Sequence, residues 1–193
     1  MKKHICALVG WLALTTMLSA CNHQANSEKT VVQVDALYPK QTIESLAQEA
    51  ETIVCGQVTG IGEAYLERVY LADGSGDYVE DPYTPITITV EDCLKGDSSL
   101  ETVVYNQSGG EFADVVYKTN DGAEVETGDN ILIFLSADGY TWGGQSVYFI
   151  EDGMTTIRND MLPTAVLSDE SESQTSEISL AELEELVLTY VNE

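Results

Sequence analysis

Short segments in which apolar and polar residues alternate fill the middle of this chain, and they constrain its fold more than any other feature. In the clearest of them, Pro85 to Cys93, residues Ile86, Ile88 and Val90 alternate with polar residues, as in a half-buried strand. Segments of similar character occur at 52–61, 65–71, 102–106, 112–118, 131–135, 146–150 and 154–157. This series of short strands predicts a mainly β protein built as a small antiparallel barrel.

Turn and helix signals frame these strands. Asp121-Gly122 and Asp152-Gly153 predict hairpin turns, because glycine readily adopts the positive φ that such turns need. Thr42 is a candidate N-cap for a helix over residues 43–50, in which apolar residues recur at helical spacing. Ser179 and Glu182 match a capping box before a final apolar stripe. The expected fold is a closed or partly open antiparallel β-barrel with an N-terminal helix and a C-terminal amphipathic helix.

The first 21 residues have the order of parts of a lipoprotein signal peptide. Lys2 and Lys3 precede an apolar run, Ile5 to Leu14, that is too short to span a hydrocarbon core of about 30 Å. Leu18-Ser19-Ala20-Cys21 then resembles a bacterial lipobox. The resemblance implies that Cys21 carries lipid such as palmitate, at the extracytoplasmic face of a bacterial membrane or the cell surface. The alternative is an ordinary secretory signal peptide that leaves Cys21 as a thiol.

Composition divides the chain into five parts. Residues 1–20 are the expected signal peptide, 21–38 a polar tether, 39–165 the β-barrel domain, 166–178 an acidic linker and 179–193 the C-terminal helix. Removing residues 1–20 takes away Lys2 and Lys3 and no acidic residue, so the formal charge of −25 becomes −27. A surface this acidic excludes nucleic acid as a partner, because phosphate binding needs clustered Lys and Arg. It favours solubility, and cationic partners remain compatible with it.

Three segments resemble the pattern of oligonucleotide/oligosaccharide-binding (OB) barrels related to the tissue inhibitors of metalloproteinases and netrin modules. They are Ala50-x-x-Ile53-Val54-x-Gly56-x-Val58, Val90-x-x-x-Leu94-Lys95-Gly96 and Gly128-Asp129-x-Ile131-Leu132-Ile133-Phe134-Leu135. The resemblance implies a five-stranded closed sheet. It does not extend to the inhibitory function, because those inhibitors present an unmodified N-terminal cysteine to zinc, whereas Cys21 is expected to be acylated.

Two cysteines remain once Cys6 leaves with the signal peptide and Cys21 takes lipid. If Val58 faces Val90 across an antiparallel pair, then Cys55 stands opposite Cys93. A disulfide between Cys55 and Cys93 is therefore a candidate, with two separate small buried thiols as the alternative.

The two histidines, His4 and His23, lie outside the expected domain. This placement excludes Ser-His and Cys-His catalysis and histidine zinc sites within the fold. These exclusions favour a protein without enzymatic activity. An extracellular glycan hydrolase that uses paired carboxylates is the alternative.

The one candidate metal site is a group of oxygen ligands for Ca²⁺. The run DGSGDYVED holds Asp73, Ser75, Asp77 and Glu80, and its Asp-x-Ser-x-Asp spacing lets three side chains converge on a hard cation. The loop departs from an EF-hand at Tyr78, where the tight-turn glycine belongs. A polar hairpin turn is the alternative, and no other cofactor is expected.

Aromatic residues beside loops provide candidate ligand contacts, Trp142 and Tyr140, which flank a Gly-Gly turn. Further tyrosines, at 65, 70, 78 and 83, are expected to pack on strand faces. The sequence therefore predicts a membrane-anchored binding or interaction module for a protein or cell-wall glycan ligand. The alternatives are the carboxylate hydrolase and a calcium-binding surface protein.

Overall fold

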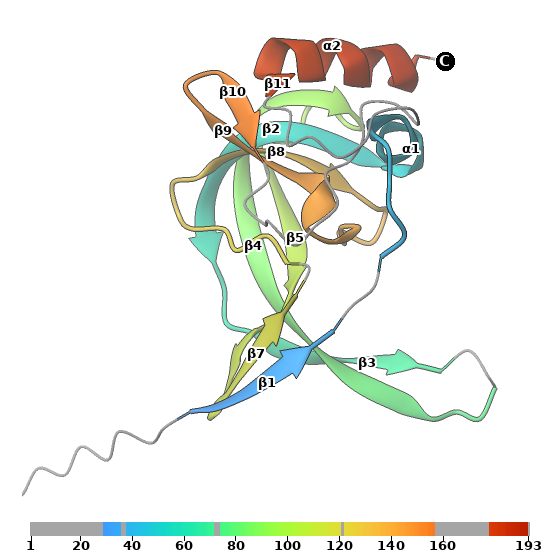
Figure 1. Ribbon diagram of the computed structural model, residues 1–193, viewed down its shortest axis with the longest axis vertical. Coiled ribbons are helices and arrows are strands. Elements are labelled where there is room, and N and C mark those ends of the chain that lie inside the picture. The colour runs from blue at the N-terminus through green and yellow to red at the C-terminus, as the bar shows by residue number, and fades with distance from the viewer. Residues whose placement is uncertain (1–28, 36–37, 72–73, 121, 157–177, 193) are drawn as a thin grey trace, which may run out of the picture.

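The computed structural model describes residues 29–35, 38–71, 74–120, 122–156 and 178–192, and it is mainly β (Figure 1). One sheet has eight strands. Seven of them follow the order β11-β10-β9-β8-β2-β4-β3, and β5 also pairs with β4. A second sheet has the order β1-β7-β6. The strands are β1 (Thr30–Val34), β2 (Thr52–Ile61), β3 (Tyr65–Tyr70), β4 (Tyr78–Lys95), β5 (Thr102–Ser108), β6 (Gly110–Phe112), β7 (Val115–Thr119), β8 (Asn130–Leu135), β9 (Val147–Glu151), β10 (Met154–Thr156) and β11 (Ile178–Ser179).

Strands β2 and β8 form the centre of the large sheet and are buried on both faces. Ile53 of β2 belongs to what we call the first core cluster, whereas the next residue, Val54, belongs to the second core cluster. Leu132 and Ile133 of β8 divide between the two clusters in the same way. This burial explains why β8 is a continuous apolar run, whereas the one-sided strand β4 alternates.

The large sheet curls around the second cluster but does not close into a barrel, which corrects the expectation of a closed sheet. Its terminal strands, β3 and β11, pair with β4 and β10 and not with each other. Closure is not needed to cover the inner face. Tyr105 of β5 and Phe149 of β9 both fill the second cluster, and Ala123 and Val125 complete it.

Two helices cover the opposite face of the sheet: α1 (Ile43–Glu49) and α2 (Leu180–Val191), and both show a capping box. Leu46 of α1 and Leu183 and Val187 of α2 are fully buried in the first cluster. The C-terminal helix is confirmed, with Ser179 as its cap. A short 3₁₀ helix, η1 (Gly143–Ser146), precedes β9. No helix in the described part of the chain is long and apolar enough to cross a membrane.

The small sheet and the β3–β4 hairpin lie at the end of the molecule away from α2 (Figure 1). Strand β1 falls within the predicted tether, 21–38, yet it pairs in parallel with β7, so those five residues belong to the fold. Asp121 of the predicted Asp121-Gly122 turn lies outside the described residues, and β7 pairs with β1 and β6 rather than with β8. The turn at Asp152-Gly153 joins β9 and β10 as predicted.

Candidate functional site

The β3–β4 hairpin places tyrosines and carboxylates side by side. Tyr65 and Tyr83 are direct partners across the two strands, and Glu67 and Asp81 form the next pair on the same face. The rings of Tyr65 and Tyr83 have centroids 6.3 Å apart. Together with Tyr140, these residues make up what we call the tyrosine–carboxylate cluster.

Tyr140 reaches this hairpin from the loop after β8. The loop turns at Ser136, whose backbone N–H donates to the carbonyl of Tyr140 at 2.9 Å, and it joins β5 through the Asn106 N–H and the Gly139 carbonyl, also at 2.9 Å. The ring of Tyr140 meets that of Tyr83 edge to face, with centroids 5.0 Å apart. Its hydroxyl donates to Glu67 Oε2. The cluster therefore combines a hairpin and a loop that are separated by about 60 residues of chain.

The phenols of Tyr83 and Tyr140 stay protonated well above neutral pH. Burial and the Asp81 carboxylate raise the pKa of Tyr83 to about 12. Burial, followed by the hydrogen bond to Glu67, raises the pKa of Tyr140. The cluster thus presents neutral aromatic rings beside carboxylates. This combination suits the ammonium or guanidinium groups of a ligand, which bind to ring faces and carboxylate oxygens.

A recess beside the cluster, lined by Tyr83, Tyr105 and Tyr140 among others, holds about 20 Å³, enough for roughly one water molecule. Two open grooves near β6 are wider, at about 590 and 330 Å³, and both have Gln107 and Glu111 in their walls. The glutamates of these grooves are solvent-exposed: Glu63, Glu111, Glu124 and Glu126. A ligand would therefore contact the cluster from its surface rather than enter it.

Of the two predicted ligand contacts, only Tyr140 lies in the cluster. Trp142 packs instead against the first core cluster, which the two helices cover. Its backbone N–H donates to Ser146 Oγ at 2.9 Å, and its carbonyl accepts from Gln145 Nε2 at 3.0 Å. Trp142 is half-buried and has a packing role in η1 and its surroundings.

The predicted calcium ligands are not brought together as a set. Asp73 lies outside the described residues. Ser75 Oγ accepts from the Asp77 backbone N–H at 3.0 Å, as in a polar turn, and Glu80 pairs with Arg68 at 3.5 Å. Across the residues with described positions, no group of three or more Asp, Glu, His or Cys side chains is arranged to hold a metal ion.

The register of β2 and β4 overturns the predicted pairing of Cys55 with Cys93. Cys93 pairs with Val54, and Cys55 pairs with Asp92, because bulges shift the register on both sides of this point. Cys55 packs in the first core cluster and Cys93 against the second, so the thiols lie on opposite faces and both are free. Burial and the nearby Glu184 carboxylate raise the pKa of the Cys55 thiol to about 12.

The lipobox, Cys21, His4 and His23 lie outside the described residues. Within these, the important residue that sequence reasoning missed is Glu67, together with its partner Asp81. A signal was present: Tyr65 and Glu67 are two residues apart, as are Asp81 and Tyr83, so a symmetric hairpin register places all four on one face.

No known protein family, no curated protein and no solved structure matches this chain.

Proposed function

We propose that this protein is an extracytoplasmic lipoprotein, anchored through Cys21, that binds a partner without catalysing a reaction. The lipid anchor is supported by the order of charged, apolar and small residues before Cys21. The binding role is supported by the tyrosine–carboxylate cluster, in which Tyr83 and Tyr140 meet beside Glu67.

The chemistry of the cluster favours a cationic ligand, and we take this to be a Lys- or Arg-bearing segment of a partner protein. Two carboxylates lie beside three aromatic rings, and the chain after residue 20 carries a formal charge of −27. The same hairpin already shows this type of contact, since the guanidinium of Arg68 lies 4.7 Å from the ring centre of Tyr78.

Two observations favour binding over glycan hydrolysis. The recess at the cluster has room for about one water molecule rather than for a sugar ring. The glutamates of the wider grooves are exposed to solvent, whereas a general acid at neutral pH needs a desolvated carboxyl.

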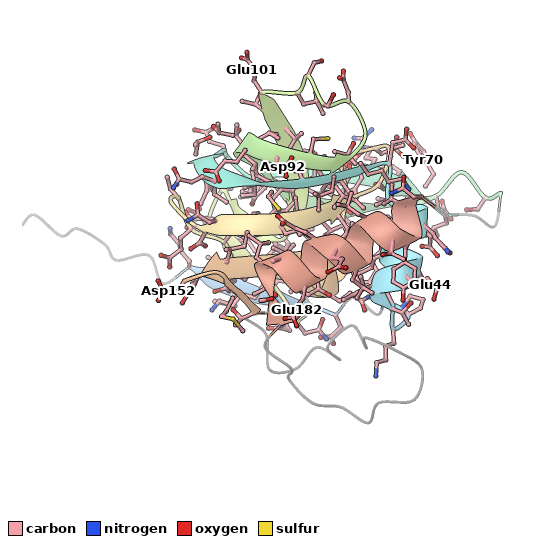
Figure 2. All side chains as sticks on the ribbon, turned by 90° about the horizontal axis from the view of Figure 1, so that it is seen from above. Glu44, Tyr70, Asp92, Glu101, Asp152 and Glu182 are labelled. Atoms are coloured by element: carbon pink, nitrogen blue, oxygen red, sulfur yellow. The ribbon has the colours of Figure 1, made fainter. Side chains whose placement is uncertain are left out.

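The test compares two double variants of the chain from residue 22, and in each variant two carboxylates are replaced by amides. Glu67→Gln with Asp81→Asn removes two charges from the cluster. Asp92→Asn with Glu101→Gln removes two charges from the opposite end of β4 and from the residue before β5 (both labelled in Figure 2). Binding of an oligolysine peptide is measured by calorimetry. We expect the cluster variant to bind roughly tenfold more weakly and the control to be close to the unmodified chain, since a well-placed charged pair is worth about 1.5 kcal/mol or more.

Equal weakening in both variants would show that only the overall charge attracts the peptide and would contradict the cluster as a site.

Purified peptidoglycan serves as the glycan probe. Retention of peptidoglycan that depends on the cluster, without peptide binding, would replace the protein ligand by a glycan. The anchor is tested separately by the mass of the membrane-extracted protein, which must exceed that of residues 21–193 by a lipid.

A further inference from the structure

Large apolar side chains are exposed at the end of the molecule formed by the β3–β4 hairpin and the small sheet. At the hairpin tip, Tyr70 is 66 % exposed. We use the term apolar end for the residues of these elements whose side chains are 40–66 % exposed: Val31, Val69, Tyr70, Leu71, Tyr78, Val79 and Phe112. Exposed apolar surface concentrated at one end of a protein marks an interaction surface.

The hairpin tip is ordered by its own cross-strand pairs. Val69 faces Val79 and Tyr70 faces Tyr78, with the tyrosine ring centroids 5.9 Å apart. Tyrosine is suited to the boundary between apolar and aqueous phases, because its ring is apolar and its hydroxyl is hydrated. Because neighbouring residues of a strand point to opposite faces, the valine pair lies on one face of the hairpin and the tyrosine pair on the other. The end of the hairpin is therefore preorganised, with exposed apolar side chains on both faces.

The position of the anchor relative to this end identifies what covers it. Strand β1 begins at Thr30, nine residues after Cys21, and Figure 1 places it at the same end as the hairpin. Nine residues span at most about 30 Å when fully extended. A lipid on Cys21 therefore attaches the molecule by the end that carries the apolar side chains, which favours contact of this end with the bilayer.

Local charge pairing is compatible with this arrangement. Both ion pairs found among the described residues, Lys29 with Glu111 and Arg68 with Glu80, lie at this end. Each pair neutralises a carboxylate that would otherwise face lipid headgroups. Other labelled acidic residues, such as Glu44 of α1, Asp152 of the β9–β10 turn and Glu182 of α2, lie on elements outside this end (Figure 2).

We propose that the apolar end docks onto the surface of the membrane that carries the lipid anchor, with Tyr70 and Tyr78 at the level of the headgroups. This inference rests on the proposed lipid anchor at Cys21. It orients the protein, because α2 then faces away from the bilayer. It also places the tyrosine–carboxylate cluster, on the same hairpin, within reach of partners at the membrane surface.

The experiment places a tryptophan at either end of the molecule. Tyr70→Trp reports on the apolar end, and Leu188→Trp reports on α2, where Leu188 is apolar and 41 % exposed. The lipidated full-length protein is reconstituted into vesicles of phosphatidylethanolamine and phosphatidylglycerol, with and without brominated acyl chains, and the fluorescence of the unmodified protein is subtracted. We expect bromine to quench the tryptophan of the Tyr70→Trp variant at least about twofold more than that of the Leu188→Trp variant, because an aromatic side chain at the interface lies close to the acyl chains.

A second arm separates this inference from the anchor itself. The chain from residue 22, with an N-terminal hexahistidine tag, is held on vesicles that contain nickel-chelating lipid, so the tether position is retained without Cys21. If the full-length protein fails to float with vesicles, the anchor is wrong, and this arm still tests the docking. Equal quenching at the two positions in the tethered chain overturns the docking. A concentration-dependent shift in the fluorescence of the Tyr70→Trp variant without vesicles would assign this end to self-association instead, which also overturns it.

Discussion

The hydroxyl of Tyr140 donates a hydrogen bond to the carboxylate of Glu67, which links the loop after β8 to the projecting hairpin. Tyr140 also contacts the ring of Tyr83 edge to face. These two contacts hold the candidate binding surface together. They join the loop after β8 to β3 and β4, which are distant from it in the sequence.

Tyr140→Phe removes this hydrogen bond and keeps the ring contact. We expect a loss of about 0.5–1.5 kcal/mol in the free energy of unfolding, measured by urea denaturation, because Glu67 is half-buried and loses a donor. Tyr190→Phe, at a half-buried position on α2, is the matched control. An unchanged midpoint for Tyr140→Phe would show that the bond adds nothing to stability.

Leu183→Ala tests the docking of α2. Leu183 is fully buried beneath the helix, and the substitution leaves a cavity in the first core cluster, so we expect a loss of about 2–5 kcal/mol. Leu188→Ala, on the exposed side of the same helix, is expected to change stability by less than about 0.5 kcal/mol. Similar effects at the two positions would contradict the packing of α2 through Leu183.

Gly56→Ala tests the close approach of β2 and β4. A Cβ atom at Gly56 would lie 2.2 Å from the backbone carbonyl oxygen of Thr89, so the strands must separate. We expect destabilisation of at least about 1–3 kcal/mol in thermal unfolding. Gly60→Ala on the same strand is the control, since its Cβ would make an ordinary contact with Thr87 at 3.5 Å.

The two free thiols predict that a reducing agent leaves the unfolding midpoint unchanged, whereas a disulfide closing this loop would add about 4 kcal/mol. In the native state, a thiol reagent is expected to modify Cys93 before Cys55, because Cys55 is 5 % exposed and its thiol pKa is raised. A shift of the midpoint on reduction would show that Cys55 and Cys93 form the disulfide after all.

Stability is expected to fall as the pH rises from about 9 to about 12. The pKa of Cys55 is raised from 9.0 to about 12 and that of Tyr83 from 10.0 to about 12 in the folded protein. Across this window, the unfolded chain has lost these protons while the folded chain retains them, so deprotonation favours unfolding. Cys55→Ala should flatten the lower part of this pH dependence in urea titrations, and an unchanged slope would contradict the burial of the thiol.

The sequence by itself determined the elements whose signals lie within a few residues. The capping box at Ser179 and the apolar stripe after it specify α2, the apolar run at 131–135 specifies β8, and Asp152-Gly153 specifies a hairpin. Such signals depend on neighbours within one turn of helix or across one tight turn, so they can be identified without the rest of the fold.

Only the tertiary structure decided which distant strands meet. The bulges of β2 against β4 move Cys55 opposite Asp92, and β1 pairs in parallel with β7 more than 80 residues away. Tyr105 and Phe149 fill the inner face, and the sheet stays open rather than closed. These outcomes depend on packing between segments far apart in the chain. Local residue patterns do not encode this packing. For the same reason, the contact of Tyr140 with Glu67 could not be read from the order of residues alone.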